Sequence, residues 1–175
     1  MNKYISIFFC VQIIALNLFA MQPKVTPVDY VRPQIDTHKS RWFFFSSASR
    51  PFGMVSLSPD TWTEGSWNSG YLYNSKEIRC FSHVHCWQLA GVPVMPTTGE
   101  VKGHKGMDAY KSTYSHETEI VKPGYHKVEL DTYQIRVELT STSRVGMHRY
   151  TYPAGEKANV LFDVGALLAH GKTEK

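Results

Sequence analysis

The sequence predicts an all-β protein, an antiparallel β-sandwich built from short strands. Runs of alternating apolar residues recur along the chain, and no convincing run of amphipathic helix lies between them. The clearest pair is 125–130 and 135–139, which the polar turn Asp131 to Tyr133 separates as in a hairpin. Strands at such spacing are typical of two packed antiparallel sheets, and 175 residues suffice for one domain with a sizeable core.

The first twenty residues differ in character from the rest of the chain. Lys3 precedes an apolar run from Tyr4 to Phe19, which ends at the small residue Ala20. A positive start, an apolar centre and a small residue near the end predict a secretory signal peptide over 1–20. A membrane anchor is the alternative, but the run is short for a span and contains polar residues. We therefore expect a secreted or periplasmic protein.

Residues 21–27 are expected to form a leader, and 28–175 the sandwich domain. The strands expected in order are 28–31, 51–58, 71–73, 78–87, 92–95, 125–130, 135–139, 145–152 and 159–164. Pro59 and Asp60 are expected to end the second of them. The net charge of +4 is modest and no Lys/Arg run is present, so composition does not favour a nucleic-acid partner.

The stretch from Ile78 to Trp87 carries the most unusual chemistry. Read as one strand, it puts small and mostly apolar residues on one face: Ile78, Cys80, Ser82, Val84 and Cys86. The other face gathers two imidazoles, a guanidinium and two aromatic rings: Arg79, Phe81, His83, His85 and Trp87. The first face suits burial, whereas a core does not need the second. This second face is therefore the candidate functional surface, although Arg79 also fits an ordinary surface ion pair.

Two cysteines remain once the signal peptide removes Cys10. In an extended strand the Cα atoms of Cys80 and Cys86 would lie roughly 20 Å apart, beyond disulfide reach. Two buried thiols are favoured unless a turn intervenes. A zinc site formed with His83 and His85 would need ligands from opposite faces of a strand, so no metal site is expected in this chain.

Two tryptophans, Trp62 and Trp67, lie in a segment rich in Gly, Ser and Asn. The apolar C–H face of a sugar packs on an aromatic ring while its hydroxyl groups bind a few polar side chains. Core packing is the usual fate of tryptophan, but Trp67 between Ser66 and Asn68 is poorly placed for it. The predicted sugar-binding residues are Trp67, Trp62, His83, His85, Trp87 and Asp60. For the histidines, backbone hydrogen bonding in the core is the alternative, and for Asp60 a role in a turn.

Several motifs in fixed order support a family resemblance. They are Pro51-Phe52-Gly53-Met54, Ser58-Pro59-Asp60-Thr61, Ser69-Gly70-Tyr71, Phe81-Ser82-His83-Val84-His85, Val94-Met95-Pro96-Thr97-Thr98-Gly99, Ser115-His116-Glu117, Pro123-Gly124-Tyr125 and Arg144-Val145-Gly146-Met147-His148-Arg149-Tyr150. Together they resemble the N-terminal domain of glycoside hydrolase family 92, the exo-acting α-mannosidases. The resemblance covers nearly all of the chain after the signal peptide.

The resemblance implies a β-sandwich packed on a larger helical-barrel domain that carries the catalytic acid, the base and the calcium ligands. Such enzymes hydrolyse terminal α-mannosides of glycans with inversion, and their N-terminal domain completes the sugar pocket. We therefore expect mannose-containing glycans and the C-terminal domain as partners, calcium in the intact enzyme, and no catalytic residue in this chain. The last residues, 163–175, contain no closing strand, which predicts a fragment.

An independent catalytic pair in this chain is not favoured. An inverting glycosidase needs two carboxylates roughly 6.5–9.5 Å apart, and nothing in the sequence sets Asp60 and Glu64 at that distance. Two alternatives to the α-mannosidase reading stay open. One is a carbohydrate-binding module that holds glycans without cleaving them, and the other is a purely structural sandwich.

Overall fold

The computed structural model describes residues 24–38, 48–63, 70–85 and 89–166. The chain divides into two units, and the boundary in the sequence lies between Val31 and Arg32. The described part of the first unit contains one short 3-10 helix, η1 (Pro27–Tyr30). A strand was predicted at this place, and that prediction is wrong. Pro27 presets a helical φ at the first position, and the Asp29 carboxylate accepts hydrogen bonds from the N–H and hydroxyl of Thr26, at 2.7 and 2.8 Å.

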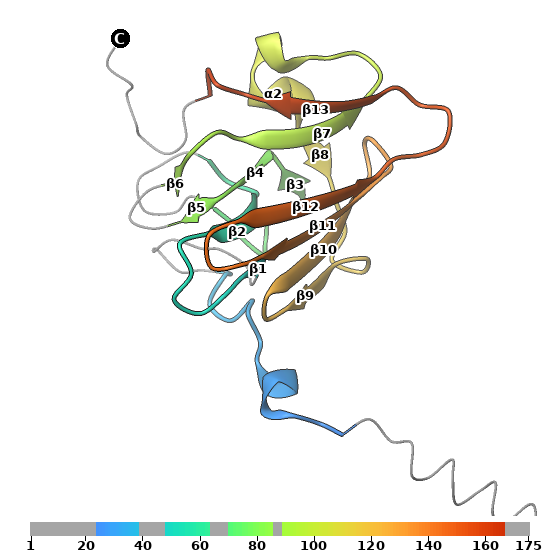
Figure 1. Cartoon of the computed structure of the whole chain (residues 1–175). Coiled ribbons are helices and arrows are strands. Elements are labelled where there is room, and N and C mark those ends of the chain that lie inside the picture. Colours follow the sequence, from blue (N-terminus) through green and yellow to red (C-terminus); the bar gives the residue numbers. More distant parts are fainter. Residues whose placement is uncertain (1–23, 39–47, 64–69, 86–88, 167–175) are drawn as a thin grey trace, which may run out of the picture. The chain divides into compact units, whose positions relative to one another are not determined.

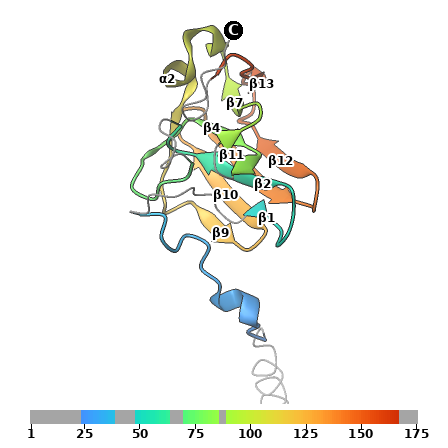
Figure 2. The same ribbon diagram turned by 90° about the vertical axis from the view of Figure 1, so that its left-hand side faces the viewer.

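The second unit is an antiparallel β-sandwich, which confirms the predicted fold class (Figures 1 and 2). Its five-stranded sheet has the order β1 (Ala48–Ser49), β2 (Ser56–Asp60), β4 (Cys80–Ser82), β7 (Val94–Thr98) and β13 (Ala158–Phe162). Its four-stranded sheet has the order β12 (Gly146–Thr151), β11 (Ile135–Ser141), β10 (Tyr125–Leu130) and β9 (Ile120–Lys122). All the pairings within these two sheets are antiparallel.

Smaller elements complete this unit. Two short strand pairs join β3 (Glu77–Ile78) to β8 (Ser112–Thr113) and β5 (Val84–His85) to β6 (Leu89–Ala90). The connection after β7 contains the 3-10 helix η2 (Gly103–Lys105) and a single helical turn, α2 (Met107–Tyr110). None of the helices in the described ranges has the length and apolar character that crossing a membrane requires.

The predicted hairpin is the best-defined part of the core. β10 and β11 pair with Val128 opposite Val137 and Leu130 opposite Ile135, and all four side chains are fully buried. From the other sheet, Leu57, Phe81 and Met95 are buried in the same apolar cluster. The period-two pattern correctly identified these strands because one face of each strand packs against the opposite sheet.

The strand expected over 51–58 is shifted in the structure. Residues before Ser56 form a turn, and β2 continues through Pro59 to Asp60 instead of ending there. The Ser56 N–H donates to the His83 carbonyl and the Asp60 carbonyl accepts from Arg79, so alternate residues of β2 bond to the β4 side. The nitrogen of Pro59 therefore points to the other edge, where β1 reaches only Ser56 and Leu57.

The turn before β2 carries a backbone strain that the sequence did not indicate. Phe52 has φ = 59° and its side chain is fully exposed, while the Gly53 N–H donates to the Arg50 carbonyl at 3.0 Å. Residues with positive φ at this position of a turn are normally Gly or Asn, because a β-carbon is strained there.

We expect Phe52→Gly to raise the free energy of unfolding by about 1 kcal/mol, since it removes this strain and no buried contact is lost. Phe52→Ala is the matched control: it removes the ring but keeps the β-carbon, and should change stability little. Urea unfolding of the three proteins measures both effects. Equal stability of the Gly and Ala variants would contradict the strain interpretation.

Candidate functional site

The stretch predicted as one strand from Ile78 to Trp87 is broken into β3, β4 and β5. Arg79 lies between the first two strands, and a bend at His83 separates the last two. The prediction that only the face of Cys80 is buried is wrong: the neighbours Cys80 and Phe81 are both fully buried, and they belong to different apolar clusters. The break also brings Cys80 and His85 to the same carboxylate, although they were predicted on opposite faces.

That carboxylate is Asp60, which forms a buried cluster with His85. His85 Nε2 lies 2.6 Å from Asp60 Oδ1, and His85 Nδ1 lies 2.5 Å from the Ser56 carbonyl oxygen; neither charged side chain is exposed. A neutral imidazole has only one N–H, and a carboxylate has none. Bonds from both ring nitrogens to oxygen therefore require a second proton in the His85–Asp60 pair, which corresponds to an imidazolium beside a carboxylate or a shared equivalent.

Cys80 completes this cluster as a buried thiol, as predicted. Its Sγ donates to Asp60 Oδ2 at 3.5 Å. Burial, reinforced by the Asp60 charge, raises the pKa of the Cys80 thiol well above its usual value. A thiol kept protonated in this way is a poor nucleophile and a poor metal ligand. Cys86 lies outside the described residues.

A pair of histidines, His83 and His148, connects the two sheets. The Nε2 atoms of His83, in the bend after β4, and His148, on β12, lie 2.9 Å apart, and the Tyr150 hydroxyl lies 2.7 Å from His148 Nδ1. One ring must donate and the other accept, so the two rings cannot both be protonated at this distance. Burial lowers the pKa of His148 to about 4, with a further contribution from His83, and burial also lowers the pKa of His83.

A third cluster surrounds the buried carboxylate of Glu119, and sequence reasoning missed it. Glu119 Oε1 lies 2.8 Å from His126 Nε2, and Oε2 lies 2.6 Å from His116 Nδ1. The hydroxyl of Tyr71 and the amide of Gln34 donate to the same carboxylate, at 2.9 and 3.1 Å. Burial alone would raise the pKa of Glu119, but these hydrogen bonds, led by His126, lower it below its usual value.

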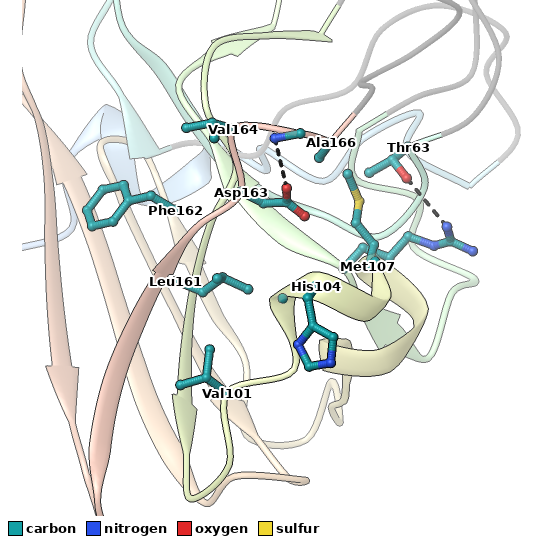
Figure 3. Close-up of a pocket in the computed structure, with 13 residues that line it drawn as sticks. Thr63, Val101, His104, Met107, Leu161, Phe162, Asp163, Val164 and Ala166 are labelled. Atoms are coloured by element: carbon teal, nitrogen blue, oxygen red, sulfur yellow. Dashed lines mark hydrogen bonds between the residues drawn. The ribbon is translucent and has the colours of Figure 1, made fainter.

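A groove of about 820 Å³ lies in the described part of this unit (Figure 3), beside the pair that Arg79 forms with Trp62. Its lining includes Thr63 and Arg79, then His104, Met107 and Leu161 from η2, α2 and β13, and Asp163 directly after β13. The guanidinium carbon of Arg79 lies 5.4 Å from the centre of the Trp62 ring, and this ring is 37% exposed. Arg79 also forms an ion pair with Asp108 at 3.6 Å, in agreement with the ion-pair reading.

The groove is lined by a guanidinium held in place and by a carboxylate whose position is fixed, and the Trp62 ring packs on that guanidinium. Asp163 accepts hydrogen bonds from the Tyr110 hydroxyl at 2.8 Å and from the Gly165 N–H at 3.1 Å. Groups of this kind suit a neutral ligand that carries many hydroxyls.

The structure places the predicted sugar-binding residues in different surroundings. Trp62 packs on Arg79, which lines the groove, whereas His83 is half-buried against His148, and Asp60 and His85 are enclosed in the core. Trp67 and Trp87 lie outside the described residues. Sugar binding by the six residues therefore stays a prediction. Within the described ranges, no three His, Cys, Asp or Glu side chains are grouped so that they could hold a metal ion.

The sequence profile of the glycosyl hydrolase family 92 N-terminal domain matches residues 30–175. The chain belongs to this family. No curated protein sequence matches it significantly.

Solved structures of family 92 enzymes have the same fold. An α-mannosidase from Bacteroides thetaiotaomicron, solved with mannoimidazole, is 37% identical over 72% of this chain, with a TM-score of 0.64. An inverting mannosidase from the same organism is 26% identical over 79% of the chain, with a TM-score of 0.69. The matched regions are 18% and 20% of those enzymes, so this chain spans about a fifth of their length.

We expect Asp60→Asn to lower the free energy of unfolding by about 3–5 kcal/mol, because it leaves the buried His85 without its counter-charge. Asp131→Asn, the same substitution at an exposed turn residue, should change it by less than about 0.5 kcal/mol. Chemical unfolding of both variants is the measurement. Equal effects at the two positions would show that Asp60 is not held as the structure describes.

The His83–His148 contact predicts acid sensitivity. The His148 pKa lies below its ordinary value of 6.5, so the unfolded chain binds this proton more readily and stability decreases as pH falls from about 6.5 towards 4. We expect a loss on the order of 1–2 kcal/mol between about pH 7 and pH 5. His148→Gln, which cannot titrate, should give a flatter dependence in urea unfolding at each pH. An unchanged slope would exclude this pair as the cause.

Proposed function

We propose that this chain is the substrate-completing N-terminal domain of a secreted, calcium-dependent α-mannosidase that removes terminal α-mannosides from glycans with inversion. The observation that carries the proposal is the family match over 30–175, together with 37% identity to a family GH92 α-mannosidase. The groove beside Trp62 supports it, because an exposed indole next to a fixed guanidinium suits a sugar ring.

The carboxylates of the described part favour a binding role over a catalytic one. Hydrolysis with inversion needs two carboxyl groups facing each other across a bound sugar. The buried carboxylates Asp60 and Glu119 are each bonded to histidine, so neither is available as an acid or base towards substrate. The same hydrogen bonds occupy the oxygens that calcium would need, and these residues do not fit a calcium site. We assign the acid, the base and the calcium ligands to the rest of the longer enzyme.

The rim of the groove supports a larger assembly. Phe162 and Val164 line it with side chains that are 62% and 85% exposed. Exposed apolar patches of this kind usually mark an interaction surface. The related enzymes are about five times longer than the matched region. Packing of the catalytic domain against this rim accounts for the exposed apolar side chains and for the greater length of the related enzymes.

The chain alone should not release mannose from 4-nitrophenyl α-D-mannopyranoside, with calcium or with a chelator, because the proposal assigns the acid, the base and the calcium ligands to the rest of the longer enzyme. A chimera in which this domain replaces the N-terminal domain of the 37%-identical enzyme should release it. The C-terminal part of that enzyme without any N-terminal domain is the control and should be inactive.

In the chimera, Trp62→Ala should raise KM roughly tenfold and leave the melting temperature nearly unchanged, by analogy with aromatic stacking. Turnover by the isolated chain that Asp163→Asn abolishes would contradict this division of roles. An inactive chimera whose isolated N-terminal domain still binds mannosides would instead favour a carbohydrate-binding module.

A further inference from the structure

A second, smaller cavity of about 280 Å³ lies on the four-stranded sheet. Leu139 and His148 belong to its lining. The other lining residues, also on β10, β11 and β12, are Tyr125, Glu138, Thr140, Met147 and Arg149. They are neighbours across the strands, because Thr140 pairs with both Tyr125 and Met147, and Glu138 pairs with Arg149. They alternate with core residues such as Val137 and Leu139, so they occupy the outer face of the sheet.

Three of these side chains are held in fixed positions. The Tyr125 hydroxyl donates to Glu138 Oε1 at 2.7 Å, and Arg149 Nε donates to Glu138 Oε2 at 2.6 Å. Arg149 Nη2 donates to Oε1 at 2.5 Å, which completes a two-pronged ion pair. The Glu138 side chain is only 13% exposed, whereas that of Arg149 is 74% exposed. A ligand would therefore meet groups whose orientation is already set, which lowers the entropy cost of binding.

The chemistry of the cavity favours a neutral, hydroxyl-rich ligand over an ion. Glu138 and Arg149 are the charged residues of the lining and form an ion pair, so the lining itself gives neither an anion nor a cation a net attraction. The pair presents donor N–H groups beside carboxylate acceptors, which matches two adjacent hydroxyl groups. The Tyr125 ring and the half-exposed Met147 add apolar surface for a C–H face. Hydrogen bonds from Arg149 and Tyr125 lower the pKa of Glu138 to about 2, so the pair stays charged at mildly acidic pH.

We propose that this cavity binds one pyranose unit of a glycan, as a second sugar contact separate from the groove beside Trp62. That the sugar is an α-mannoside rests on the proposed function, whereas the existence of the site rests on the cavity itself. The competing explanation is an ordinary cross-strand ion pair on a solvated sheet face, which would bind no ligand.

The test is an NMR titration of the ¹⁵N-labelled chain with methyl α-D-mannopyranoside. We expect saturable amide shifts at Tyr125, Thr140 and Met147, with a dissociation constant on the order of 1–10 mM, as for a single weakly held sugar. Shifts that do not saturate, or that occur only around Trp62 and Arg79, would overturn the proposal. This result needs no variant, so it holds even where a substitution impairs folding.

Substitutions then identify the contacts. Tyr125→Ala should weaken binding about tenfold, whereas Tyr125→Phe, which keeps the ring, should retain most of it. Thr151→Ala is the matched control, because Thr151 is also exposed on β12 but lies outside the cavity lining. Melting curves establish that each variant is folded. Equal binding by the Tyr125→Ala and Thr151→Ala variants overturns the proposal.

Trp62→Ala separates this site from the proposed function. Binding at Tyr125 that survives Trp62→Ala supports the second site, even where the chimera shows no mannosidase activity. An active chimera whose isolated N-terminal domain shows no shifts at Tyr125 supports the proposed function and rejects the second site.

Discussion

Asp60 is fully buried, and the course of the chain from Ile78 to His85 depends on how this carboxylate is compensated. A buried carboxylate is costly unless hydrogen bonds and an opposite charge compensate it. His85 supplies both, but it reaches Asp60 only because the chain bends at His83 and ends β4 after three residues. The same bend directs His83 towards β12. The Asp60–His85 contact and the His83–His148 contact therefore both depend on this bend.

The domain buries its other main carboxylate in the same way, on the side of the four-stranded sheet. Glu119 lies between His116 and His126 and also accepts hydrogen bonds from Tyr71 and Gln34. Segments far apart in the sequence therefore meet at one charged group. The His83–His148 contact is of the opposite kind, because it excludes a proton instead of holding one. Acid should therefore weaken the His83–His148 connection between the sheets as the pH falls below about 6.5.

The sequence predicted the regular parts of this fold well, and it did not predict the polar clusters. A period of two relates Val128, Leu130, Val137 and Leu139, because the same face of the sheet buries all four side chains in the core. Asp60 and His85 are 25 residues apart, and no periodic pattern relates two residues that meet through a bend. The sequence pattern does not indicate the bend, because Phe81, His83 and His85 occupy every second position, as they would in one unbroken strand. Only the His116–Glu119 contact, at a spacing of three residues, offered a local signal.

The histidine pairing also explains why a binding role suits this domain better than catalysis. A carboxylate that serves as acid or base must be free to exchange a proton with substrate, yet Asp60 and Glu119 are saturated with internal donors. Their interactions stabilise the sandwich and withdraw both groups from chemistry. Under the proposed function, Trp62 and Tyr125 offer aromatic rings to a sugar, each beside a paired charge. In the proposed enzyme, these side chains would orient a glycan for carboxylates that another domain provides.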